Sequence, residues 1–150
     1  MKKEEVKYIV VHCSATRENM NYLPSQLDRD HRMRGFNGAG YHFYITKDGY
    51  IHSMRPLDVW GAHCKGYNHV SIGVCYEGGI TARGEFSDTR TEAQRKSLYS
   101  LLRILKKDYP AARIVGHRDL SSDRNGDGII DRRDWVKVCP CFDVMSEYVF

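Results

Sequence analysis

Residues Lys7-Tyr-Ile-Val-Val-His12 form a short apolar run, rich in β-branched side chains, that ends on a histidine. A run of this length and composition is typical of a buried strand. Arg113-Ile-Val-Gly-His117 has the same character and also ends on a histidine. Val70–Tyr76 predicts a further strand. The sequence therefore predicts buried strands, two of which carry a histidine at their carboxyl ends.

A β-hairpin is predicted within Tyr41–Arg55, which lies between the predicted strands Lys7–His12 and Val70–Tyr76 in the sequence. Tyr41–Thr46 alternates in polarity, Lys47-Asp-Gly49 follows, and Tyr50–Arg55 alternates again. An Asp-Gly pair between two alternating runs is a strong hairpin signal.

Two longer helices and one short helix complete the prediction. Pro24–Arg34 has proline in its first turn and is followed by Gly35. Thr91-Glu-Ala-Gln94 matches a capping box and opens a helix to about Asp108. The buried stripe of this helix contains Leu98, Leu101, Leu102 and Leu105. A short closing helix is predicted within Phe142–Val149. The fold expected over residues 1–150 is one mixed α/β domain, a central mixed β-sheet flanked by helices.

The composition is that of an ordinary globular protein, with 150 residues, 41% apolar and 28% charged, and a net charge of +4. No run approaches the roughly 20 apolar residues that span a bilayer, so no membrane insertion is expected. The amino-terminal residues lack the apolar region of a signal peptide, which predicts synthesis in the cytoplasm. Lysine and arginine are scattered, and no nucleic-acid partner is expected.

The chain has five cysteines, an odd number, and no apparent secretion signal, so a disulfide framework is not expected. Cys13, Cys64 and Cys75 are predicted to pack as small buried hydrophobes. Cys139 and Cys141 lie in Lys137-Val-Cys-Pro-Cys-Phe-Asp143. His12 and His117 end predicted strands, and such ends lie at a common edge of a sheet where sites tend to form, but a histidine at a strand end is by itself more often structural than a metal ligand.

An ordered series of motifs runs through almost the whole chain, from about Tyr8 to Val144. Each motif is weak alone, but their order is specific. The motifs are Ile9–His12, Gly40–Tyr44, Arg55-Pro56, Gly61–His63, Gly66–Asn68, Ser71–Val74, Gly78-Gly79, Thr91 with Gln94, Val115–Asp119 and Lys137–Asp143. With this series the chain resembles the N-acetylmuramoyl-L-alanine amidase type 2 family, especially the phage amidase lysozymes and prophage endolysins.

The resemblance implies a zinc ion held by His12, His117 and Cys139. Two imidazoles and one thiolate leave the fourth tetrahedral position for water. The bound ion lowers the pKa of that water and polarises the scissile carbonyl. The motif register favours Cys139, which precedes Pro140, and Cys141 remains the rival for the third position.

The resemblance also assigns four further residues. Tyr41 and Lys137 match the two catalytic positions, where a hydroxyl and an ammonium stabilise the attacking water or the oxyanion. His63 matches a position that lines the substrate groove, with a structural role as the alternative. Asn68 either fixes a loop or contacts the substrate.

An acidic segment precedes the cysteine motif. Asp123, Asn125, Asp127, Asp131 and Asp134 occupy oxygen-ligand positions of a calcium-loop template, with Gly128 at its sixth position. A calcium ion there would order the loop that carries Lys137 and Cys139. The alternative is a pair of turns in which the side chains bond to their own backbone.

The function implied is hydrolysis of the amide bond between N-acetylmuramic acid and L-alanine in peptidoglycan or muropeptides, by a monomer. A compact chain of this kind fits a prophage endolysin that reaches the cell wall through holin pores. A cytosolic muropeptide-recycling amidase and a non-catalytic peptidoglycan-binding module are the alternatives, the latter disfavoured by Tyr41, Lys137 and Cys139. A polymerase-type regulatory partner is neither supported nor excluded. A zinc peptidase is disfavoured because no His-Glu-x-x-His helix is present and Glu77 is the nearest candidate base.

Overall fold

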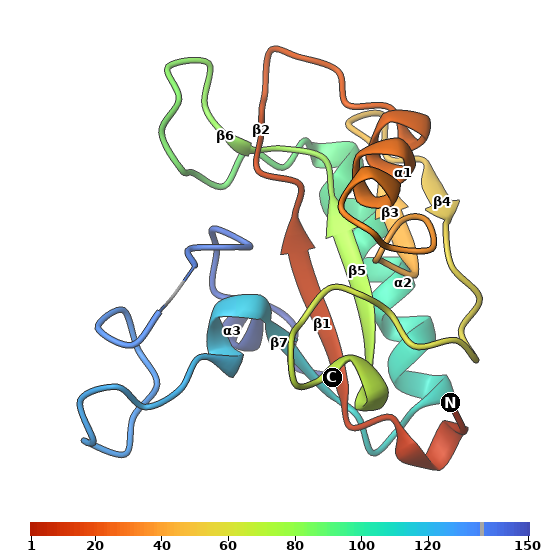
Figure 1. Ribbon diagram of the computed structural model, residues 1–150. Coiled ribbons are helices and arrows are strands. Elements are labelled where there is room, and N and C mark those ends of the chain that lie inside the picture. The colour runs from red at the N-terminus through yellow and green to blue at the C-terminus, as the bar shows by residue number, and fades with distance from the viewer. Residues whose placement is uncertain (136) are drawn as a thin grey trace.

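A five-stranded sheet forms the centre of the protein in the computed structural model, which describes residues 1–135 and 137–150 (Figure 1). Its strand order is β4-β3-β5-β1-β7. The strands are β1 (Tyr8–Cys13), β3 (Phe43–Ile45), β4 (Ile51–Ser53), β5 (Ser71–Tyr76) and β7 (Arg113–Gly116). The pairs β1–β5, β1–β7 and β3–β5 are parallel, while β3–β4 is the predicted antiparallel hairpin. The mixed α/β fold predicted from the sequence is confirmed.

The predicted helices are present as α1 (Pro24–Met33), α2 (Glu92–Asp108) and the short α3 (Val144–Glu147). The strand predicted to include His117 ends one residue earlier, and His117 begins a short 3-10 helix, His117–Leu120. A second small sheet of β2 (Thr16–Arg17) and β6 (Gly79–Ile80) was not predicted. Two-residue strands are too short to show a periodic pattern. Within residues 1–135 and 137–150, no helix has the length and apolar character needed to cross a membrane.

Figure 1 shows α1 and α2 on opposite faces of the sheet, and each face carries its own cluster of buried side chains. Ile9, Val11 and Cys13 join the larger core, to which α2 contributes its predicted leucine stripe and α3 contributes Val144. Successive strand residues point to opposite faces, so Val10 and His12 lie on the other face. On this second face Leu27 of α1 packs with a smaller cluster that includes Tyr44 and Cys75. The alternation of β1 therefore directs His12 away from the main core.

The amino-terminal end of α2 is fixed by the predicted capping box. The Thr91 side chain accepts a bond from the Gln94 amide (3.1 Å), and Gln94 Oε1 accepts one from the Thr91 amide (3.0 Å). The buried Gln94 Nε2 also donates to the carbonyls of Ile45 (3.0 Å) and Glu77 (2.9 Å). One side chain therefore ties α2 to the carboxyl-terminal ends of β3 and β5.

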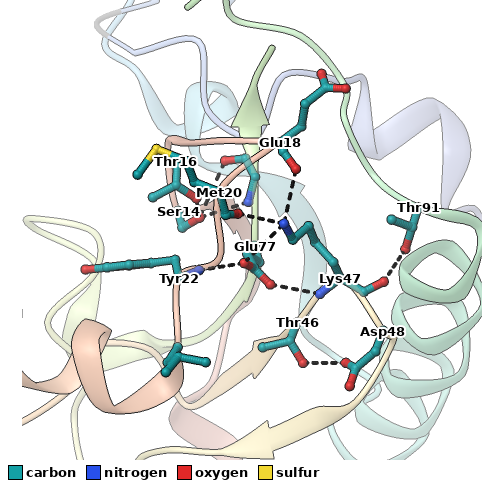
Figure 2. Close-up of polar contacts among 12 residues, drawn as sticks. Ser14, Thr16, Glu18, Met20, Tyr22, Thr46, Lys47, Asp48, Glu77 and Thr91 are labelled. Atoms are coloured by element: carbon teal, nitrogen blue, oxygen red, sulfur yellow. Dashed lines mark hydrogen bonds and ion pairs between the residues drawn. The ribbon is translucent and has the colours of Figure 1, made fainter. Parts of the chain in front are cut away.

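Glu77, which follows β5, is a buried carboxylate that joins two loops (Figure 2). One oxygen accepts a hydrogen bond from the Tyr22 amide (2.7 Å) and the other from the Lys47 amide (2.9 Å). Lys47 Nζ in turn donates to the carbonyls of Glu18 (3.1 Å) and Met20 (2.6 Å). Because both carboxylate oxygens accept backbone amides, Glu77 holds the loop before α1 against the hairpin and has a structural role.

Replacing Glu77 with alanine should therefore destabilise the protein. Two backbone amides would lose their acceptor in a buried place, which predicts a loss of about 3 kcal/mol in the free energy of unfolding. Urea denaturation measures this change, with Glu85→Ala on the exposed part of the following loop as the control. Equal unfolding midpoints for the two variants would show that the Glu77 contacts contribute nothing to stability.

Arg90 connects α3 to the segment before α2. Its guanidinium, with the side chain fully buried, bonds to Asp88 (2.9 Å), to Glu147 (2.9 Å) and to the Tyr148 hydroxyl (2.9 Å). It also stacks on the ring of Phe142, 3.4 Å from the ring centroid. The hydrogen bond from Arg90 lowers the pKa of Glu147. Burial opposes ionisation of Asp88, but its bonds to Arg90 outweigh burial, and the pKa of Asp88 is also lowered.

This cluster predicts a loss of stability in acid. Carboxyl groups with a lowered pKa in the folded state stabilise the protein above their ordinary pKa values of 4.5 and 3.8, and lose this effect as the pH falls through the folded values. The thermal midpoint should fall as the pH drops from about 6 to below about 4. Glu147→Gln should lower the midpoint at neutral pH and flatten this acid dependence. An unchanged slope in Glu147→Gln would exclude Glu147 as a cause.

Candidate active site

Two adjacent parallel strands bring the two predicted histidine ligands together. His12 lies near the end of β1, and His117 directly follows β7, where Val11 pairs with Gly116. The ring centroids of the two histidines are 4.6 Å apart. The ligand atoms of His12, His117 and Cys139 all lie within 4.8 Å of one another. The three residues singled out from the sequence therefore form one cluster.

Hydrogen bonds attach the segment carrying Cys139 to the carboxyl-terminal ends of β1, β5 and β7. The Cys139 carbonyl accepts a bond from the Arg118 amide (3.0 Å), and the Tyr76 hydroxyl donates to the Pro140 carbonyl (2.6 Å). The Cys13 amide donates to Cys139 Sγ (3.1 Å). This bond fixes the Cys139 sulfur at the carboxyl-terminal end of β1, beside His12.

The rival cysteine lies outside this cluster. Cys141 Sγ is 3.9 Å from Cys13 Sγ and 3.5 Å from the carbonyl oxygen of Gly79. The contact with the Cys13 thiol, followed by burial, raises the pKa of Cys141. Cys13 is itself buried, as are Cys64 and Cys75, which confirms their prediction as small buried side chains. The geometry thus favours Cys139 over Cys141 as a ligand.

The cluster fits a zinc ion. Burial, followed by the neighbouring His63, His117 and Lys137, lowers the pKa of His12, so its imidazole is neutral at pH 7 and keeps a lone pair for a metal. Two imidazole nitrogens and one sulfur are a donor set typical of zinc, and three protein ligands leave one position for a reacting water.

The ligands line one groove of about 920 Å³ with the other predicted site residues. Tyr41, His63, Asn68 and Lys137 all line it, and Lys137 is exposed. The Tyr41 ring centroid is 5.0 Å from that of His12. Burial raises the pKa of Tyr41, so its hydroxyl keeps its proton and remains a hydrogen-bond donor. The structure places all four residues in the groove that contains the candidate metal ligands.

His63 and Asn68 also make contacts within the protein. Asn68 Oδ1 accepts bonds from the amides of His63 (2.9 Å) and Cys64 (2.9 Å), which is the loop-fixing role left open by the sequence. His63 Nδ1 lies 2.8 Å from His12 Nε2. Burial, followed by His42, His117 and Arg55, lowers the pKa of His63 to about 3. Their contact with a substrate stays a prediction.

Two further histidines, His31 and His42, are buried. His42 accepts a bond from the Gly73 amide (3.0 Å) and its Nε2 lies 2.8 Å from the Val59 carbonyl. His31 Nδ1 accepts one from the Gly40 amide (2.7 Å), and His31 also lines the groove. Their partners are backbone groups distant in sequence, which a local pattern does not reveal.

The acidic loop brings together three of its five predicted calcium ligands. Carboxylate oxygens of Asp123, Asp127 and Asp134 lie within 4.8 Å of one another. Other contacts fit the alternative, in which side chains of the turns bond to nearby backbone: Asn125 Oδ1 accepts a hydrogen bond from the Asp127 amide (3.3 Å). Arg133 forms ion pairs with Asp131 (2.7 Å) and Asp127 (2.7 Å). Calcium binding here therefore stays a prediction.

Calorimetric titration with calcium tests this prediction. If the loop binds calcium, the heat of binding should disappear in Asp127→Ala and persist in Asp108→Asn, which changes an exposed carboxylate at the end of α2. Absence of heat at millimolar calcium in the parent protein would leave the turn interpretation.

The groove therefore contains a candidate metal centre of two imidazoles and one cysteine sulfur, a half-buried tyrosine hydroxyl and an exposed ammonium. This set is the one expected at the active site of a metal-dependent hydrolase. Residues 2–136 match the family model described as N-acetylmuramoyl-L-alanine amidase, and the chain belongs to this family of peptidoglycan amidases.

Relatives support this assignment along nearly the whole chain. The endolysins of Klebsiella phage KP32 and Escherichia phage T7 are 38% and 37% identical over 143 and 142 residues, and each alignment covers 95% of this chain and 85% of the relative. Peptidoglycan-recognition protein LB of Drosophila melanogaster is 31% identical over 127 residues, which cover 75% of this chain and 51% of that protein.

A solved structure has the same fold. N-acetylmuramoyl-L-alanine amidase LysC from Clostridium intestinale URNW matches with a TM-score of 0.73 and 29% identity, over 97% of this chain and 83% of that chain. The chain is thus a family member close to the T7-type endolysins and more distantly related to the peptidoglycan-recognition proteins.

Proposed function

We propose that the protein hydrolyses the amide bond between the lactyl group of N-acetylmuramic acid and the L-alanine of the stem peptide, with a zinc ion held by His12, His117 and Cys139. The observation that carries this proposal is the cluster of these three ligands in the groove of a chain that belongs to the amidase family.

Each residue around the cluster has a defined task in this reaction. A bound zinc ion supplies Lewis acidity and a water of lowered pKa. Lys137 presents its ammonium from the exposed side of the groove to the oxygen that becomes negative when the carbonyl is attacked. The Tyr41 hydroxyl, which stays protonated, donates a hydrogen bond to the attacking water or to the same oxygen.

The groove favours an anionic peptide. Arg34, Lys65 and Arg118 line it in addition to Lys137. Stem peptides carry carboxylates, and a groove lined by cations concentrates such ligands. The loop containing His63 and Asn68 forms another part of the lining and contributes contacts to the peptide.

We further propose that the protein acts as a prophage endolysin, made in the cytoplasm and released to the cell wall through holin pores. The endolysins among its relatives support this setting. A muropeptide-recycling enzyme is the alternative. Initial rates on intact sacculi and on anhydro-muropeptides separate the two: an endolysin cuts sacculi efficiently, whereas a recycling enzyme acts mainly on the small anhydro product.

Mass spectrometry of the products tests the bond that is cut. Zinc-loaded protein is incubated with purified sacculi and, separately, with a soluble muropeptide. The proposal predicts release of intact stem peptides with a free alanine amino group and an uncut glycan. Glycan fragments or cleavage within the peptide would contradict it, and binding without any product would favour the non-catalytic module.

A further inference from the structure

A chain of side-chain hydrogen bonds leads from the candidate ligand His12 back into the sheet. His12 Nε2 is 2.8 Å from His63 Nδ1, and His63 Nε2 is 3.2 Å from Ser71 Oγ. Ser71 Oγ lies 2.8 Å from the carbonyl oxygen of Tyr67. Ser71 is fully buried at the start of β5.

The far end of this chain sets the direction of every bond in it. A carbonyl oxygen only accepts, so the single Ser71 hydroxyl proton points to Tyr67. Ser71 Oγ is then left to accept a proton from His63 Nε2. A neutral imidazole with a proton on Nε2 has its lone pair on Nδ1, which accepts a proton from His12 Nε2.

These bonds also determine the state of the other ring nitrogen of His12, Nδ1. With its proton on Nε2, His12 keeps the lone pair on Nδ1, and that atom faces Cys139 Sγ at 3.9 Å. We propose that Ser71 and His63 are positioning residues that hold His12 in the tautomer and orientation needed to ligate zinc through Nδ1. This inference deepens the proposed function and rests on it for the identity of the metal.

Packing holds the His63 ring in the orientation that the bonds require. A Cβ atom on Gly73 would lie 2.7 Å from His63 ring carbons, and one on Gly61 would lie 2.4 Å from the ring. The two glycines therefore leave the space that the imidazole occupies. The His63 ring stands at 87° to that of His12, with its Nδ1 2.8 Å from His12 Nε2.

The register of the sheet explains why Ser71 is within reach. Tyr8 pairs with Ser71, Val10 with Gly73 and His12 with Cys75 along β1 and β5. Residues two apart share a face, so Ser71 and Gly73 lie on the face that carries His12. His63 is not part of the three-residue ligand cluster, so any effect it has on the metal acts through its contact with His12.

Zinc affinity is the first test, measured by competition with a chromophoric chelator. Groups that orient a ligand contribute about 10–100-fold to metal affinity. We expect His63→Phe to weaken zinc binding by about that range and Ser71→Ala by about tenfold. Ser97→Ala is the matched control, because Ser97 also donates to a backbone carbonyl, that of Gly49, but has no link to a histidine. It should leave the affinity unchanged.

Nitrogen-15 NMR of the histidine rings is the second test and needs only the parent protein. The inference predicts Nε2–H tautomers for both His12 and His63, and loss of the single His63 tautomer in Ser71→Ala. A proton on His63 Nδ1 in the parent, or parental zinc affinity in both variants, would overturn it. If a variant fails to fold, the parent spectrum still decides. Neither measurement uses peptidoglycan. If the zinc affinities and the spectra are as predicted but the protein cleaves no amide, the proposed function is refuted and the present inference is not.

Discussion

Replacing Cys139 with alanine should abolish zinc binding at the site and lower amidase activity by about three orders of magnitude or more. The reason is that Cys139 supplies the only sulfur in the cluster with His12 and His117, and its Sγ lies 3.9 Å from His12 Nδ1. Two imidazoles alone provide neither the charge nor the third ligand that a catalytic zinc site requires. Metal content after dialysis and the initial rate on a soluble muropeptide measure the two effects.

Cys141→Ala is the matched control, two residues along the same segment. Its sulfur contacts Cys13 and Gly79 rather than the ligand histidines. Zinc content and rate should remain near those of the parent, with a loss of about 1 kcal/mol in the free energy of unfolding from the smaller side chain. If Cys141→Ala loses zinc while Cys139→Ala keeps it, the assignment of the third ligand is wrong.

Lys137→Ala should lower kcat by about 10²–10³-fold while the zinc content stays unchanged. The ammonium lines the groove and is not one of the ligands, so its removal affects the oxyanion and not the metal. Tyr41→Phe should lower kcat by about 10²-fold, because the variant keeps the ring beside His12 and removes the hydroxyl donor.

Lys65→Ala provides the comparison for both variants, because Lys65 is another exposed cation in the groove. We expect it to raise KM and leave kcat nearly unchanged, as for a residue that only attracts an anionic substrate. If Lys137→Ala also changes KM alone, Lys137 serves in substrate attraction and does not stabilise the transition state.

Much of the fold could be predicted from local patterns. The β-branched runs of β1 and β7 and the Asp-Gly turn of the hairpin are strong short-range signals. The capping box likewise marked the start of α2 correctly. The pair β2–β6 could not be predicted, because each strand has two residues and its pairing joins segments far apart in the chain.

The candidate site was predictable in its ligands and less so in their surroundings. The family resemblance implied His12, His117 and Cys139 as ligands, and its motif register left Cys141 as an alternative. The strand ends alone predicted only that the two histidines would lie at one edge of the sheet. Only the three-dimensional arrangement places Cys141 beside Cys13. The motif Ser71–Val74 assigned no role to Ser71, because the role proposed for it depends on a hydrogen bond to His63 and on the space left by Gly73.

X-ray absorption at the zinc edge of the zinc-loaded protein tests the central claim most directly. The account predicts one sulfur at about 2.3 Å, two imidazole nitrogens at about 2.0–2.1 Å and one oxygen ligand. The sulfur contribution should disappear in Cys139→Ala and remain in Cys141→Ala. Two sulfur ligands, or a first shell without sulfur, would contradict a zinc centre built from His12, His117 and Cys139.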